Sequence, residues 1–199
     1  MALPQPDFAL LRKAQRGDER AFAVIVRSYE LPVFNYVLRT VGDRGLAEDL
    51  TQDIFLRVYQ GLPGFSLRCR FTTWLFQVAK NRLLDELRAR ERRPYAAVAI
   101  EDAPPIDVVD APPERIETID AVWRAVALLN PDLKMSLLLR DVVGLSYHEI
   151  ADSLEITLAT VKWRIYKARE EVQLALEREG IRLYGRESGV VARDDAVST

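Results

Sequence analysis

The chain has 199 residues, of which 49% are hydrophobic and 29% are charged, with one cysteine and one histidine. This length and apolar content suit one or two small domains with cores of their own. A single cysteine excludes an internal disulfide and favours a reducing compartment, so we expect a cytoplasmic protein. One cysteine and one histidine make no credible zinc site, and we expect neither a metal nor a cofactor.

The formal net charge of −2 conceals two segments of opposite charge. Residues 8–93 carry 16 Lys and Arg against 10 Asp and Glu, a net charge of +6, whereas residues 94–120 carry 1 against 7, a net charge of −6. A polyanion would therefore meet the basic surface of the first segment. The first residues lack a basic region followed by an apolar run, and the longer apolar runs are broken by charge. We expect no signal peptide and no membrane insertion.

A helical pattern of apolar residues runs from Asp7 to about Thr40, interrupted by a turn in which Asp18 is predicted to cap the next helix. Residues 46–61 continue as an amphipathic helix that ends at a glycine. The outer side of this helix is acidic and includes a leucine: Asp49, Gln52, Asp53 and Leu56. Such a face fits a docking surface for a basic helix, although an ordinary solvated face is the alternative.

Residues 62–71 form a predicted loop that leads into a helix over residues 72–93. The apolar stripe of this helix is predicted to be buried: Leu75, Phe76, Ala79, Leu83 and Leu87. Trp74, Gln77 and Asn81 lie on the opposite side, where an aromatic ring and two amides suit contacts with bases. Alternatively, Trp74 plugs the core at the start of the helix.

Residues 94–119 are acidic and rich in proline, without a helical period, and are predicted to be a flexible linker. Two further helices are predicted over residues 120–129 and 131–143. Residues 181–199 show no clear pattern and are predicted to be a disordered tail.

Residues 144–176 contain two predicted helices joined by a tight turn. The first opens at Ser146 with Glu149 three residues on, a capping box, and Thr157 begins the second. One face of the second helix is apolar: Val161, Ile165, Ala168, Val172 and Ala175. A short amphipathic helix followed by a longer basic one is typical of a helix-turn-helix, although an ordinary helical hairpin is the alternative.

Two blocks of the sequence resemble the bacterial sigma factors of RNA polymerase, in their extracytoplasmic-function group. The first is AEDLTQDIFLRVYQGLPGF followed by FTTWLFQVAKNRLLDELR, and the second is LLLRDVVGLSYHEIADSLEITLATVKWRIYKARE. The resemblance implies an all-α fold of two small helical domains, sigma region 2 at 8–93 and sigma region 4 at 120–180, joined by the acidic linker. It also implies a protein that binds core polymerase, recognises two promoter elements and promotes DNA melting, without being an enzyme itself.

The resemblance assigns a role to each surface. The residues implied to dock on the coiled coil of the polymerase largest subunit are Asp49, Gln52, Asp53 and Leu56. Those implied at the minus-10 element are Phe65, Arg68, Phe71, Trp74, Gln77 and Asn81. At the minus-35 element, the residues implied to approach bases are Thr160, Lys162, Trp163 and Lys167, while Arg164 and Arg169 are expected on phosphates.

The sequence departs from the family where Trp163 replaces a small polar residue on the presumed groove face. The minus-35 preference of relatives therefore does not carry over to this chain. Members of the group are commonly restrained by an anti-sigma factor, so such a partner is expected, and a stress or envelope response is implied. The alternative function is a freestanding helix-turn-helix regulator that never enters polymerase.

Overall fold

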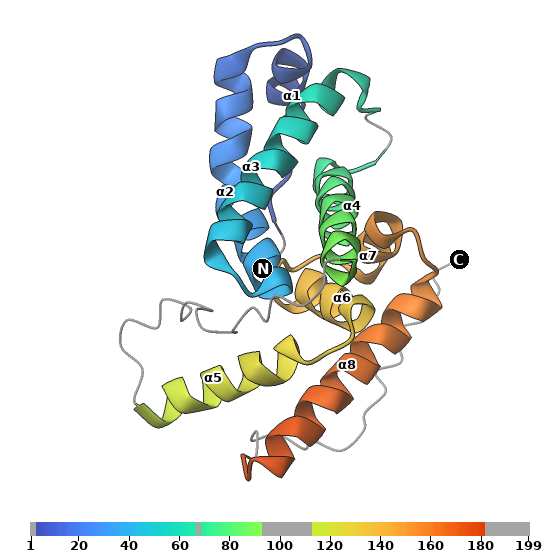
Figure 1. Ribbon diagram of the computed structural model, residues 1–199. Helices are drawn as coiled ribbons and strands as arrows, with labels where there is room; N and C mark the ends of the chain where they lie inside the picture. Colours follow the sequence, from blue (N-terminus) through green and yellow to red (C-terminus); the bar gives the residue numbers. More distant parts are fainter. Residues whose placement is uncertain (1–2, 67–68, 93–112, 182–199) are drawn as a thin grey trace, which may run out of the picture.

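The computed structural model describes residues 3–66, 69–92 and 113–181, and these ranges contain helices and no strand (Figure 1). The all-α prediction is confirmed. Most of the predicted linker at 94–119, nearly all of the predicted tail at 181–199, and Arg68 lie outside the described residues.

Four α-helices and a short 3-10 helix form the first bundle: α1 Phe8–Gln15, α2 Glu19–Val41, α3 Arg44–Gly61, η1 Leu62–Gly64 and α4 Phe71–Glu91. The second bundle contains α5 Pro113–Ala127, α6 Pro131–Asp141, α7 Tyr147–Leu154 and α8 Leu158–Arg178. Helix α5 begins within the stretch predicted as linker. Proline lacks an amide hydrogen and has a fixed φ, so it suits the first position of a helix, and this signal places the start at Pro113.

Three predicted helix caps are confirmed. The Asp18 carboxylate accepts hydrogen bonds from the amides of Arg20 and Ala21 at the start of α2. Ser146 and Glu149 form the reciprocal capping box of α7, and the Thr157 hydroxyl accepts from the third amide of α8. Each such cap contributes about 1 kcal/mol to helix stability, so local sequence fixes both helix starts of the helix-turn-helix.

The core of the first bundle forms where α2, α3 and α4 pack on one another. Its largest fully buried side chains include Tyr29, Tyr36, Leu50, Phe76 and Leu83. Within the described residues, α2 alone is long and apolar enough to cross a membrane. This helix packs against α1, α3 and α4 and is the central helix of the first bundle.

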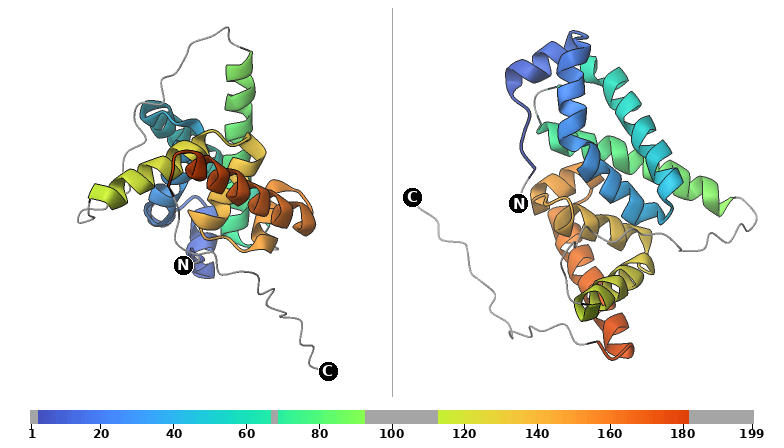
Figure 2. Two further views of the ribbon diagram at one scale, coloured as in Figure 1. Left: turned by 90° about the horizontal axis from the view of Figure 1, so that it is seen from below. Right: turned by 90° about the vertical axis from the view of Figure 1, so that its left-hand side faces the viewer.

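The two bundles lie against each other, with α4 resting on α7 and the end of α2 resting on α6 (Figures 1 and 2). A second connection joins α2 to α5, because the Arg39 guanidinium stacks over the Trp123 ring, 3.8 Å from its centre. The chain therefore adopts a closed arrangement in which the helix-turn-helix covers part of α4.

The Tyr36 hydroxyl is fully buried and has no hydrogen-bond partner among the described residues, and burial raises the pKa of this phenol. We expect Tyr36→Phe to leave the free energy of unfolding unchanged or raise it by up to about 1 kcal/mol, because the substitution removes an unpaired polar group. Urea denaturation measures this change. The matched variant Tyr29→Phe should lose about 1 kcal/mol, since the Tyr29 hydroxyl donates to the Pro4 carbonyl. A clear loss of stability in Tyr36→Phe would contradict the conclusion that the buried Tyr36 hydroxyl is unpaired.

Candidate functional site

The outer face of α3 is exposed along its length. Asp49 and Gln52 face solvent, and Leu56 is 60% exposed although it is a large apolar side chain. Asp53 is different, because its carboxylate is held by Arg82 of α4 and by Arg57 one turn on. Burial raises the pKa of Asp53, but the hydrogen bonds and charges of the two arginines outweigh it and lower the pKa overall.

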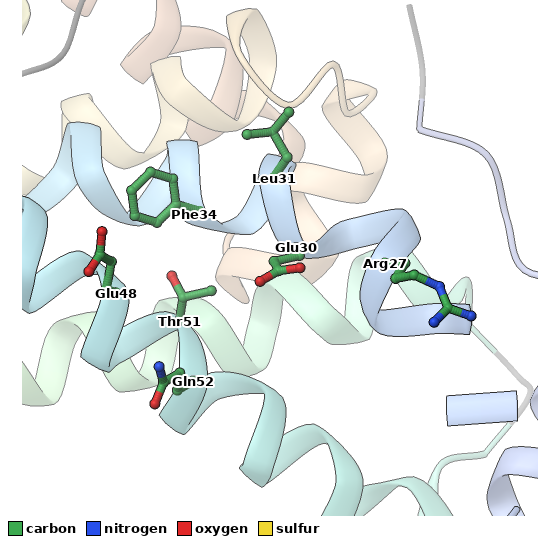
Figure 3. A pocket seen from close by; sticks show the side chains of 7 residues that line it. All are labelled: Arg27, Glu30, Leu31, Phe34, Glu48, Thr51 and Gln52. Atoms are coloured by element: carbon green, nitrogen blue, oxygen red, sulfur yellow. The ribbon is translucent and has the colours of Figure 1, made fainter. Parts of the chain in front are cut away.

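A groove of about 490 Å³ runs beside this face, between α2 and α3 (Figure 3). Its lining residues from α2 are Arg27, Glu30, Leu31 and Phe34, and those from α3 are Glu48, Thr51 and Gln52. Leu31 is 65% exposed at its edge. Gln52 belongs both to the groove and to the outer face of α3, so the two form one continuous surface with apolar and acidic parts.

The aromatic residues at the start of α4 are packed together. Phe65 is 6% exposed and Phe71 1% exposed, and neither ring reaches solvent in this conformation. Phe65 stacks on the half-buried Trp74 with ring centres 4.8 Å apart, and Phe71 contacts Phe65, Trp74 and Tyr29. Trp74 therefore packs partly into the core at the start of α4, as one of the two alternatives predicted, while part of its ring remains at the surface.

The polar side of α4 faces the turn of the helix-turn-helix. Gln77 Nε2 donates to Glu155 Oε1 at 3.0 Å, and Lys80 Nζ lies 2.8 Å from Glu155 Oε2. The side chain of Lys80 is only 7% exposed. Its hydrogen bond and charge lower the pKa of Glu155. Asn81 remains exposed, so only part of the candidate minus-10 face is covered.

A second contact between the bundles centres on Glu149, the capping-box residue of α7. Its Oε1 atom lies 2.9 Å from Arg70 Nη1 and accepts at 3.5 Å from the Thr72 hydroxyl. Its Oε2 atom accepts from the amide and hydroxyl of Ser146. One turn further along α7, the Ser153 hydroxyl donates to the Thr73 carbonyl at 3.0 Å.

Cys69 lies exposed beside the same contact. Burial and the negative charge of Asp152 raise the pKa of its thiol. A higher pKa lowers the thiolate fraction of Cys69 at neutral pH, which disfavours a reactive thiol at this position.

Helix α8 presents an exposed aromatic and basic face. Trp163 is 59% exposed and Tyr166 is 68% exposed, and Lys162 is also open to solvent. Thr160 is half-buried at the start of α8, where its hydroxyl contacts Thr157. Lys167 is half-buried and pairs with Glu170 at 2.7 Å.

Two arginines of α8 form ion pairs with helix α6. Arg164 Nη2 lies 2.6 Å from Asp132 Oδ2, and Arg169 Nη2 lies 2.6 Å from Asp141 Oδ1. Asp132 lies in the first turn of α6, and Asp141 is its last residue. The ion pairs therefore hold α8 to α6 at two points, and they occupy the groups that the sequence suggested for phosphate contacts.

Sequence reasoning missed three parts of this arrangement: the groove at Leu31 and Phe34, the Lys80–Glu155 pair, and Tyr166. The first had a signal in Leu31, an apolar residue outside the buried stripe of α2. Tyr166 follows Trp163 by one turn on an otherwise polar face, which is also a readable signal. The ion pair joins residues 75 positions apart, and no local pattern indicates it.

Family models match both halves of the chain. Sigma-70 region 2 matches residues 25–93, and Sigma-70 region 4 matches residues 119–172. The RNA polymerase sigma-H factor of Pseudomonas aeruginosa is 35% identical over 187 residues, which cover 89% of this chain and 97% of that protein. The ECF RNA polymerase sigma-E factor of Haemophilus influenzae is 33% identical over 183 residues, covering 87% and 96%.

Two solved structures share the fold. CnrH in complex with the cytosolic domain of CnrY has a TM-score of 0.67 and 23% identity, covering 86% of this chain and 97% of that chain. The sigma factor RpoE in complex with the anti-sigma factor NepR from Bartonella quintana has a TM-score of 0.64 and 21% identity, covering 78% and 96%. The two family models and the relatives from Pseudomonas aeruginosa and Haemophilus influenzae place the chain in the sigma-70 family of RNA polymerase sigma factors, in its extracytoplasmic-function group.

Proposed function

We propose that this sigma factor divides its work among three surfaces. The outer face of α3, with Asp49, Gln52 and Leu56, binds the coiled coil of the polymerase largest subunit. The start of α4 serves the minus-10 element and the start of α8 serves the minus-35 element. The observation that carries the first assignment is Leu56, a large apolar side chain held in solvent on an acidic helix.

The groove between α2 and α3 extends this docking surface. Leu31 and Phe34 add apolar area next to Gln52, while Glu30 and Glu48 add negative charge. A basic helix with apolar side chains fits such a surface, because acidic groups complement its charge and the groove accepts its apolar residues. Asp53 contributes less directly, since Arg57 and Arg82 already neutralise its charge and fix α3 on α4.

At the minus-10 element, the proposed contacts come from the loop and the first turns of α4: Phe65, Arg68, Phe71, Trp74, Gln77 and Asn81. Extruding a base costs a few kcal/mol of stacking, which an aromatic pocket can offset. Phe65 and Phe71 are buried, so we assign them to the floor of such a pocket. Trp74 and Asn81 then offer the accessible ring and amide.

At the minus-35 element, Thr160, Lys162, Trp163 and Lys167 approach base edges at the N-terminal part of α8, which is the part that enters the major groove in this motif. Arg164 and Arg169 are engaged by Asp132 and Asp141 in the free chain. We propose that they orient α8 on α6 and reach phosphates only where these exposed aspartates yield, since surface ion pairs are weak.

The closed arrangement has a consequence for this division of work. Glu155 lies in the turn that precedes α8, and it binds Gln77 and Lys80 on α4. Both promoter-reading helices therefore meet at one contact, and the bundles separate before they occupy two DNA elements at once. Because the contact is polar, water and DNA phosphates can replace its partners at modest cost.

Three finer assignments complete the proposal. The factor works in the cytoplasm, has no catalytic activity of its own, and directs polymerase to genes of a stress or envelope response. An anti-sigma factor restrains it, by analogy with the structural relatives whose complexes contain the cytosolic domain of CnrY and the anti-sigma factor NepR. The freestanding-regulator alternative leaves the exposed Leu56 face and its groove without a role.

Run-off transcription with core polymerase tests the docking surface. We expect Leu56→Glu to weaken core binding by about 1–2 kcal/mol, roughly 5- to 30-fold, and to lower promoter-dependent transcripts at limiting factor. The substitution removes the apolar contact area of Leu56 and adds a charge to the outer face of α3. Leu128→Glu is the control, because Leu128 is 78% exposed in the second bundle. Equal core affinity for both variants would refute the assignment, and a factor that binds duplex DNA without core would favour the freestanding regulator.

Selection from a library of randomised promoters tests the groove face of α8. Trp163→Ser should change the preferred base at one or two minus-35 positions, because the indole offers apolar contact to thymine methyl groups. The difference in binding free energy between bases at these positions should change by about 1–3 kcal/mol. The salt dependence of binding should not change, since no charge is removed. Leu174→Ser serves as the control, being 45% exposed nearer the C-terminal end of the same helix. An unchanged sequence preference would contradict the role of Trp163.

Small-angle scattering tests the closed arrangement. Glu155→Lys places a second ammonium group beside the buried Lys80, and the two positive charges repel each other. We therefore expect the bundles to separate and the radius of gyration to rise by a few Å, toward the value of two linked domains. Glu179→Lys makes the same charge change at an ion pair with Arg124 inside the second bundle, and it should leave the radius unchanged. Identical radii for both variants would contradict the proposal that Glu155 holds the two bundles together.

A further inference from the structure

Helix α4 lacks a cap of its own. Its N-cap residue is Arg70, whose side chain makes no capping hydrogen bond, and the first turn contains no acidic residue. The first amides of a helix have no partner within the helix and need one from elsewhere. Helices α2, α3, α7 and α8 all satisfy such an amide with the side chain of their N-cap residue. In the first bundle, α1 and α4 are the α-helices whose N-cap side chain makes no such hydrogen bond, and α4 is the one proposed to open the promoter.

The missing cap is supplied by Gln5, which lies 66 positions earlier in the sequence. Gln5 Oε1 accepts a hydrogen bond from the Phe71 amide at 2.9 Å. Gln5 Nε2 donates to the Thr72 hydroxyl at 2.6 Å. One carboxamide thus serves the first two residues of α4, with its oxygen facing a donor and its nitrogen facing an acceptor, as the chemistry of the amide requires.

The segment that carries Gln5 is itself anchored to the first bundle. The Tyr29 hydroxyl donates to the Pro4 carbonyl, and Leu3 packs against the core. Pro4 and Pro6 flank Gln5 and fix two φ angles, which lowers the entropy lost when the segment is ordered. Figure 2 shows this segment running from the N-terminus to α1 beside the bundle.

The capped residue is also the centre of the aromatic cluster. The Phe71 ring lies 5.4 Å from Tyr29, 6.0 Å from Phe65 and 5.9 Å from Trp74, centre to centre. Its position determines where the loop aromatic Phe65 and the accessible ring of Trp74 are held. A second glutamine supports the same loop, because Gln15 Nε2 donates to the carbonyls of Leu62 and Phe65.

We propose that Gln5 is a positioning residue for promoter opening: it caps α4 from the N-terminal segment and thereby fixes the aromatic pocket that receives the minus-10 strand. This inference rests on the proposed role of α4 at the minus-10 element. A pocket that is already in place need not be ordered when the base arrives, so the cap accelerates opening and does not contribute to core binding.

The experiment compares Gln5→Leu with Gln5→Glu in the full-length factor bound to core polymerase. Leucine cannot accept a hydrogen bond from the Phe71 amide. Glutamate retains an acceptor for that amide and places a negative charge at a helix N-terminus, which is favourable. It accepts from the Thr72 hydroxyl once the bundles separate and that hydroxyl no longer donates to Glu149. Gln173→Leu is the matched control, because Gln173 lies on the exposed face of α8 and, within the described residues, its side chain pairs only with Glu177.

We expect Gln5→Leu to slow opening of a duplex promoter by about five- to tenfold, as read by fluorescence of 2-aminopurine in the minus-10 element. Gln5→Glu and Gln173→Leu should open at the wild-type rate. On a template already unpaired at the minus-10 element, Gln5→Leu should bind and initiate much closer to wild type, because the barrier it raises is then bypassed. A general loss of folding would lower activity on both templates and lower core affinity.

Hydrogen exchange at the Phe71 amide provides a reading that is independent of transcription. Faster exchange in Gln5→Leu, restored in Gln5→Glu, supports the cap, and unchanged exchange overturns it. Faster exchange with normal promoter opening overturns the positioning role. Trp74→Ala distinguishes the role of Gln5 from the proposed role of Trp74. If Gln5→Leu slows promoter opening and Trp74→Ala does not, the positioning role of Gln5 is supported and Trp74 is not part of the proposed pocket.

Discussion

Helix α4 is covered on two sides, and the rest of the molecule is arranged around that constraint. Its apolar stripe, with Leu75, Phe76, Ala79 and Leu83, is fully buried in the first bundle. Its polar side meets α7 through Thr73, Gln77 and Lys80. A helix that is buried against one partner can tilt or slide, but one held on two sides has a defined axis and register. The position of α4 therefore depends on both bundles in the closed arrangement.

The two contacts of α4 differ in kind. The apolar contact excludes water, and each large side chain in it contributes about 1.5–3 kcal/mol relative to an exposed position. The contact with α7 consists mainly of hydrogen bonds and ion pairs that include well-exposed groups such as Glu155. These exchange for water at a small net cost. Separation of the bundles is thus cheap relative to unfolding of either one.

Much of the fold follows from local sequence. The caps at Asp18, Ser146 and Thr157 involve residues within three positions of the amides they bind, so pattern alone finds them. Most of the buried stripe of α4 was predicted for the same reason, since helical period decides which residues share a face, although Leu87 at its end is only half-buried. The start of α5 was placed seven residues late because an acidic, proline-rich composition outweighed the single signal of Pro113 as a first helical residue.

The candidate site was predictable only in part, because its decisive contacts join distant residues. Phe65 and Phe71 were identified as candidates from the motif, but their burial depends on Tyr29 and Trp74, which come from other turns and helices. Arg164 and Arg169 read as free cations on a basic helix, whereas Asp132 and Asp141 pair with them from about 30 positions away. Single-sequence periodicity gives the face of a residue and not its partner across the fold.

Glu149 shows how the closed arrangement can be reversible without weakening the helix-turn-helix. Its Oε2 atom binds Ser146 within α7, and its Oε1 atom binds Arg70 and Thr72 of the first bundle. When the bundles separate, only Oε1 loses its protein partners, and the capping box keeps its own two hydrogen bonds. The freed oxygen becomes accessible to water, so no buried charge is left unpaired. The same carboxylate therefore stabilises α7 in both arrangements and links it to α4 in one.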